Sequence, residues 1–195
     1  MSFNEDPPFG LGQTLGVSSA SDGVGWVGAK KEFPDVHPVT GVIRSNRVKT
    51  CIATRNTSGA ALLPKRVGTF LAGSGPAIFG AISGYTNASN QEFVGVIDEY
   101  LPAAGVAALD VFWTVVDGPT EMLVALSGAD VAAGDRLVAI TAITSGATTA
   151  GRVTPFTTIA ATSNLGSALV GIIAYAASAA TTANSVLAFV STKLK

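Results

Sequence analysis

Residues 111–126, VFWTVVDGPTEMLVAL, decide the fold class of this chain. Two apolar runs, at residues 111–116 and 121–126, are rich in the β-branched and aromatic side chains that favour strands. Between them lie Asp117, Gly118 and Pro119, which are residue types typical of turns because of the backbone angles that they tolerate or impose. The pattern predicts two antiparallel strands joined by a turn at residues 117–120.

Short runs of the same kind recur about every ten residues from residue 48 onward, which is the pattern of an all-β sandwich or barrel. Residues that favour turns separate these runs, and we expect little helix. The sequence therefore predicts an all-β fold with a compact sandwich or barrel body. The other predicted strands cover residues 48–54, 66–71, 77–82, 93–97, 137–143, 169–175 and 186–191.

Residues 1–47 differ from this body, and we predict two parts: an extended N-terminal arm of residues 1–47 and a β-rich body of residues 48–195. Frequent Gly and Pro exclude a regular helix from the arm. Apolar side chains such as Phe9, Leu11 and Trp26 nevertheless recur every few residues, which disordered tails do not show. Such an arm is suited to lie across another protein. The alternative is that it packs on its own body.

The charges are distributed unevenly along the chain. Residues 30–66 contain eight basic and two acidic side chains, residues 67–135 contain eight acidic and no basic ones, and residues 153–192 contain none. Opposite fields on two parts of one chain suit a subunit that binds copies of itself or an acidic scaffold. Charged residues make up 13% of the chain, against a usual ~25%. We therefore expect a homo-oligomer that buries much of its surface.

Two other classes of partner are not favoured. The most apolar run, residues 168–180, is shorter than the ~20 residues of a membrane-spanning helix, and the acidic N-terminus does not resemble a signal peptide. The basic residues lack a helix that would enter a nucleic-acid groove, and the pI is about 5.7 rather than above ~9. We expect neither membrane insertion nor nucleic-acid binding.

No pattern of residues predicts catalysis. The single histidine, His37, lies between two prolines in an extended segment without a held partner, and the single cysteine, Cys51, falls in an alternating strand. One Cys and one His cannot form a Cys/His zinc site. The G-x-G-x-x-G match at residues 23–28 lacks the flanking strand and helix of a dinucleotide site. We expect no enzyme, cofactor or metal, with a hydrolase that uses Asp98 or Asp117 as the alternative.

Four stretches of the chain resemble strands of the capsid decoration (cement) proteins of tailed phages. They are ATRNTSGAALLP at residues 53–64, FVGVIDEY at 93–100, VFWTVVDGPT at 111–120 and VGIIA at 170–174. The resemblance covers roughly residues 48–195. It implies a non-enzymatic, β-tulip-like body on the outside of an icosahedral head, often trimeric, with dimeric members known. The arm is not general to that family.

We therefore expect a structural virion protein that binds the exterior of a phage head and stabilises it. The body would self-associate, with a trimer favoured and a dimer as the other option, while the arm would lie on the major capsid protein and staple neighbouring capsomers. The alternative is a carbohydrate-binding attachment module displayed on a virion or cell surface. The expected capsid-binding residues are Trp26, Lys30, Lys31, Phe33, Val39, Ile43, Arg44 and Arg47.

Overall fold

The computed structural model describes residues 7–17, 25–71, 80–86, 93–126, 130–140, 150–156 and 172–192. All named elements in these ranges are strands, which confirms the all-β prediction. Among the described residues, no helix is long and apolar enough to cross a membrane. The strands are β1 (Lys30–Val36), β2 (Ile43–Asn56), β3 (Val67–Phe70), β4 (Ala81–Tyr85), β5 (Val94–Ile97), β6 (Val111–Leu123), β7 (Arg136–Ala139), β8 (Val153–Pro155), β9 (Ile172–Ala176) and β10 (Ser185–Ser191).

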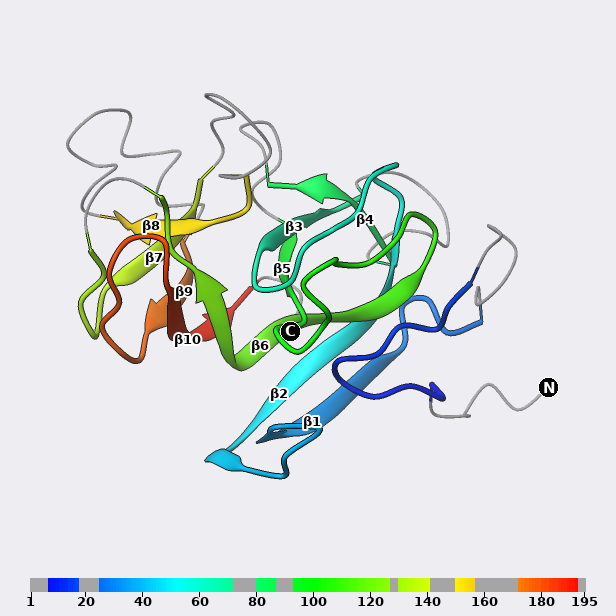
Figure 1. The fold of residues 1–195 in the computed structure, drawn as a ribbon, viewed down its shortest axis with the longest axis horizontal. Coiled ribbons are helices and arrows are strands. Elements are labelled where there is room, and N and C mark those ends of the chain that lie inside the picture. Colours follow the sequence, from blue (N-terminus) through cyan, green and yellow to red (C-terminus); the bar gives the residue numbers. More distant parts are fainter. Residues whose placement is uncertain are drawn as a thin grey trace.

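The sheet folds into two rings that share strand β6. In the first ring, β2, β4, β3, β5 and β6 pair in that order, and a further pairing of β2 with β6 closes the ring. In the second ring, β6, β10, β9, β7 and β8 pair in order, and a bridge between Val124 and Val153 closes it. Figure 1 shows the two lobes, with β6 running between them. The body is therefore barrel-like on both sides of β6.

Both faces of β6 are buried, because each faces a different hydrophobic core. Phe112 and Val116 belong to a cluster that draws residues from all five strands of the first ring. Trp113 and Val115, which alternate with them, belong to a second cluster that includes the interior of the second ring. A strand that is buried on both faces reads as a continuous apolar run. This explains the sequence VFWTVV at residues 111–116.

The turn predicted at residues 117–120 is wrong, because β6 continues through it from Val111 to Leu123. Gly118 has a φ of 100°, and a Cβ atom there would lie 2.5 Å from the carbonyl oxygen of Val48. Glycine is needed at this point for its left-handed backbone and for the close approach of β2. At the same place β6 changes partners, from β2 and β5 to β10.

The predicted boundary at residue 47 lies inside β2, and β1 pairs with β2 from Lys30 opposite Ile52 to Val36 opposite Ile43. Residues 30–36 and 43–47 are therefore part of the sheet. Residues 1–6 and 18–24 of the predicted arm lie outside the described residues, as do residues 77–79, 141–143 and 169–171 of three predicted strands.

The N-terminal segment of residues 7–17 packs on the body of its own chain. The ring of Phe9 lies 5.0 Å from the ring of Trp113, and the indole Nε1 of Trp113 donates a 3.0 Å hydrogen bond to the Phe9 carbonyl. Farther along, the amide of Gly16 donates to the Asp110 carboxylate at 2.7 Å. These contacts correspond to the alternative in which the arm packs on its own body. Contact between the arm and another protein stays a prediction.

Candidate interaction surface

Strands β1 and β2 form an antiparallel hairpin that extends beyond the rest of the sheet (Figure 1). Only the part of β2 from Thr50 to Arg55 pairs with β6, so the first half of β2 has β1 as its neighbour. The register shifts between Pro34 and Val36, which is a local irregularity of the ladder. The connection at residues 37–42 lies at the turn end of the hairpin, where the ring of His37 contacts the ring of Tyr100 on the body at 4.9 Å.

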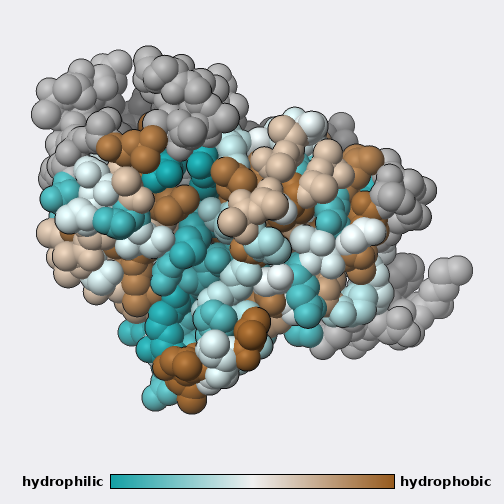
Figure 2. Space-filling view, viewed as in Figure 1, coloured by the Kyte–Doolittle hydropathy of each residue, from teal (hydrophilic) through white to brown (hydrophobic). Residues whose placement is uncertain are grey.

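The turn end of the hairpin carries exposed aliphatic side chains. Val39 is 87% exposed, Ile43 66% and Val42 63%, and we call these three residues the hairpin tip. Figure 2 shows apolar surface gathered at the end of the hairpin, next to hydrophilic surface along its flank. Single exposed apolar residues are common on proteins, but a group of them at a projecting end is typical of an interaction site.

The connection at residues 37–42 is held by a network around His37. The amide of His37 donates to the carbonyl of Val42 at 2.9 Å, and the amide of Gly41 donates to the carbonyl of His37 at the same distance. The ring nitrogen Nδ1 of His37 accepts hydrogen bonds from the amides of Val39 and Thr40, each at 3.2 Å. The backbone that carries the tip is therefore ordered before any partner binds.

A largely buried cluster of four charged side chains fixes the turn end of the hairpin to the body. Arg44 contacts Asp35 at 2.6 Å and Glu99 at 2.7 Å, and Lys49 contacts Glu99 at 2.7 Å and Asp35 at 3.6 Å. The side chains of Asp35 and Lys49 are fully buried, and that of Glu99 almost so. We call Asp35, Arg44, Lys49 and Glu99 the charged cluster. The cluster joins the hairpin to Glu99, which lies two residues after the end of β5.

The charges within this cluster stabilise one another. Burial raises the pKa of the Asp35 carboxyl, but hydrogen bonds from Arg44 and Ser45 outweigh it, so the pKa lies below its ordinary value. Burial opposes ionisation of Glu99 too, and the hydrogen bond from Arg44 and the charge of Lys49 lower its pKa. Both carboxylates are therefore ionised at neutral pH, as a balanced cluster of two anions and two cations requires.

The neighbouring carboxyl of Asp98 holds the N-terminal segment. It accepts the amide of Gly12 at 2.5 Å and the amide of Tyr100 at 3.1 Å. Burial raises the pKa of Asp98 to about 6, although these two hydrogen bonds act in the opposite direction. Asp98 and Glu99 thus face different partners, as adjacent residues in an extended segment do. The predicted hydrolase alternative gains no carboxylate pair from them.

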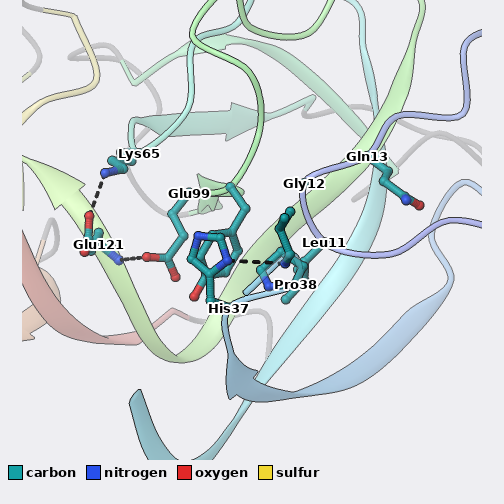
Figure 3. A pocket seen from close by; sticks show the side chains of 10 residues that line it. Leu11, Gly12, Gln13, His37, Pro38, Lys65, Glu99 and Glu121 are labelled. Atoms are coloured by element: carbon teal, nitrogen blue, oxygen red, sulfur yellow. Dashed lines mark hydrogen bonds and ion pairs between the residues drawn. The ribbon is translucent and has the colours of Figure 1, made fainter. Parts of the chain in front are cut away.

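A cavity of about 510 Å³ lies beside the charged cluster, between the hairpin and the N-terminal segment. In Figure 3 the carboxylate of Glu121 faces Lys65, and Glu99 accepts the amide of Glu121. The acidic side chains that line the cavity, Glu99 and Glu121, therefore already have cationic partners. Within the described part of the chain, no group of three or more His, Cys, Asp or Glu is placed to hold a metal ion. The lining residues are Leu11, Gly12, Gln13, His37, Pro38, Val39, Lys65, Glu99, Tyr100 and Glu121.

The structure separates the eight predicted capsid-binding residues into four groups. Val39 and Ile43 meet at the hairpin tip, and Lys30 and Arg47 are exposed elsewhere on the hairpin. Arg44 belongs to the charged cluster. Phe33 lies 5.1 Å from the ring of Trp113, and Trp26 and Lys31 are half-buried.

Sequence reasoning missed Val42 and, apart from Arg44, the members of the charged cluster. Val42 lies between Gly41 and the predicted residue Ile43, so its signal was its place in a short apolar pair beside a turn glycine. The cluster gave no local signal, because Lys49 and Glu99 are 50 residues apart in the chain.

The chain has few matches among known proteins. No protein-family model matches it, and no curated protein does. Among solved structures, the N base of the head fiber protein gp8.5 of bacteriophage phi29 is 17% identical, and the match covers 75% of this chain and 98% of that one with a TM-score of 0.41. A similarity at this level defines neither the fold nor the function of the chain.

Proposed function

We propose that this chain is a structural protein of a phage virion that binds the exterior of the head through the hairpin tip. The observation that carries the proposal is the placement of Val39, Val42 and Ile43 in solvent at the end of a hairpin with an ordered backbone. The resemblance of the body strands to decoration proteins supplies the class of partner. That partner would be the major capsid protein, with an apolar groove that accepts the tip.

The tip is suited to docking because it is already ordered. Burying a Val or Ile side chain fully contributes about 1.5–3 kcal/mol, and three such residues set the upper limit of what the tip supplies. An ordered backbone avoids much of the entropy lost when a flexible loop binds. One tip per subunit is still a weak anchor. A homotrimer would present three tips at once and would gain avidity by engaging neighbouring capsomers.

The experiment is cosedimentation of the purified chain with phage heads that lack it. We expect Val39→Asp and Ile43→Asp together to abolish binding, because a carboxylate cannot enter an apolar groove without a large desolvation cost. The matched control is the double variant Leu71→Asp with Leu126→Asp, which adds the same two charges at exposed apolar residues outside the tip. Undiminished binding by the double variant would show that the tip is not the anchor. Light scattering would distinguish trimer from dimer.

The carbohydrate-binding alternative gains less from the structure. Such modules stack sugars on exposed aromatic rings, as aromatic faces do with ligands generally. Trp113 is fully buried beneath Phe9 and Phe33, and Trp26 is half-buried. The exposed aliphatic residues of the tip instead favour contact with a protein.

A further inference from the structure

A row of four side chains crosses the face of the second ring. Arg136 on β7 lies opposite Tyr175 on β9, and Tyr175 lies opposite Phe189 on β10. Residues directly opposite one another in antiparallel strands share a face of the sheet. The guanidinium of Arg47, on β2, lies over the ring of Phe189 at 4.8 Å. We call Arg136, Tyr175, Phe189 and Arg47 the arginine–aromatic row.

The two arginines at the ends of this row are available to a partner. Arg47 and Arg136 are exposed, and no carboxylate among the described residues lies within ion-pair distance of either guanidinium. The other four arginines are engaged. Arg44 belongs to the charged cluster, Arg55 and Arg66 are buried, and Arg152 donates to the Val124 carbonyl.

The middle of the row is aromatic and accessible. Tyr175 is 49% exposed, and Phe189 is half-buried beneath Arg47. Tyrosine and arginine are the residue types enriched at the energetic centres of protein interfaces, while lysine is depleted there. Stacking on Phe189 holds the Arg47 guanidinium in place, so less side-chain entropy is lost when its donors bind a carboxylate.

We propose that the arginine–aromatic row binds an extended acidic segment of another polypeptide. Adjacent strands lie about 4.8 Å apart, so Arg136 and Phe189 are separated by about 10 Å. In the extended polyproline II conformation a chain rises about 3.1 Å per residue with three residues per turn, so acidic side chains three residues apart lie on one face and match this span. Each carboxylate would accept a forked pair of hydrogen bonds from one arginine, and an intervening side chain would pack on Tyr175.

Single-stranded nucleic acid is the other ligand that arginines and aromatic rings accept. The structure favours an acidic polypeptide for two reasons. The row offers two open cations in place of a continuous basic groove, and the chain as a whole has a net charge of −1. A polyphosphate backbone would therefore meet little further attraction beyond the row.

The test is fluorescence anisotropy with the full chain and a fluorescein-labelled 12-residue peptide that carries Glu at every third position between Ser and Tyr. The control peptide has Gln in place of every Glu. We expect saturable binding of the Glu peptide only, weakened about five- to tenfold by Arg47→Gln or by Arg136→Gln, since each removes a charge-assisted pair of hydrogen bonds. Tyr175→Ala should weaken binding as well.

Lys30→Gln is the matched control for charge, because Lys30 is an exposed cation on the hairpin outside the row. Loss of binding by Lys30→Gln equal to that of the arginine variants would overturn the proposal, as would the absence of saturable binding to the Glu peptide. Binding of labelled oligothymidylate that the same arginine variants abolish, with no binding of the peptide, would overturn it in favour of nucleic acid. Heads are absent from this assay, so its result is independent of docking by the hairpin tip.

Discussion

Replacing Glu99 with Gln tests whether the charged cluster holds the hairpin to the body. The Glu99 carboxylate accepts from Arg44 at 2.7 and 2.9 Å and from Lys49 at 2.7 Å. In the Glu99→Gln variant the amide group would face these cations with one acceptor and two donor hydrogens. The fully buried ammonium of Lys49 would keep Asp35, at 3.6 Å, as its anionic partner, together with the ring of Tyr100 at 5.0 Å.

The expected loss follows from leaving a cation buried without its main partner. Removing one member of a buried pair costs about 3–5 kcal/mol in the free energy of unfolding. For a chain of this size each kcal/mol lowers the melting temperature by about 2–4 °C, so Glu99→Gln should lower it by roughly 10 °C. Urea unfolding followed by circular dichroism measures the free energy, and a thermal scan measures the midpoint.

Two further variants make this experiment decisive. Glu121→Gln breaks the 2.6 Å contact with Lys65, where both side chains are about one-third exposed, and a longer 3.9 Å contact with Arg44, and it should cost less than about 1 kcal/mol. The double variant Lys49→Met with Glu99→Gln leaves Asp35 and Arg44 as a neutral pair, and it should recover at least about 2 kcal/mol relative to Glu99→Gln alone. If Glu99→Gln costs no more than Glu121→Gln, the cluster does not fix the hairpin.

Three other expectations concern the anchors of the fold. Burial raises the pKa of Asp98 from 3.8 to about 6. The contribution of Asp98 to the free energy of unfolding is therefore full below pH ~4, and at most about 3 kcal/mol of it is lost as the pH rises through 6. Asp98→Asn should remove this pH dependence from a series of urea titrations between pH 4 and 7. Phe9→Ala uncovers Trp113 and should cost about 3–5 kcal/mol, with a red shift of tryptophan fluorescence as the second readout; an unshifted spectrum would contradict the packing. Gly118→Ala forces a Cβ atom against β2 at a φ of 100°, whereas Gly134→Ala places one in open space at a similar φ of 91°. Calorimetry should therefore show that Gly118→Ala lowers the free energy of unfolding by at least about 2 kcal/mol more than Gly134→Ala does.

The sequence predicted the strands well where burial alone selects their residues. The run VFWTVV is apolar and β-branched because both of its faces are buried, and the strand appears where predicted. The turn prediction failed at Asp117 and Gly118. A glycine here is compatible both with a turn and with a strand that another backbone approaches closely. The deciding atom is the carbonyl of Val48, about 70 residues away in the chain.

The charge pattern was visible in the sequence, but its pairing was not. The basic zone and the acidic zone were interpreted as surfaces for other subunits. In the structure, Arg44 and Lys49 from the first zone meet Glu99 from the second within one chain. Charges that pair within one subunit and charges that pair between subunits leave the same pattern in the sequence. Only the topology, which places β2 beside β6 and near the end of β5, distinguishes them.

The sharing of β6 between two rings has a consequence for the order in which the chain can be completed during synthesis. The first ring needs strands up to residue 116, whereas the second half of β6 pairs with Ser185–Ser191, which is synthesised about 60 residues later. Until then, residues 117–123 present an unpaired strand edge, which other chains can pair with. A product truncated before residue 185 should therefore aggregate, because the second half of β6 then lacks its partner strand.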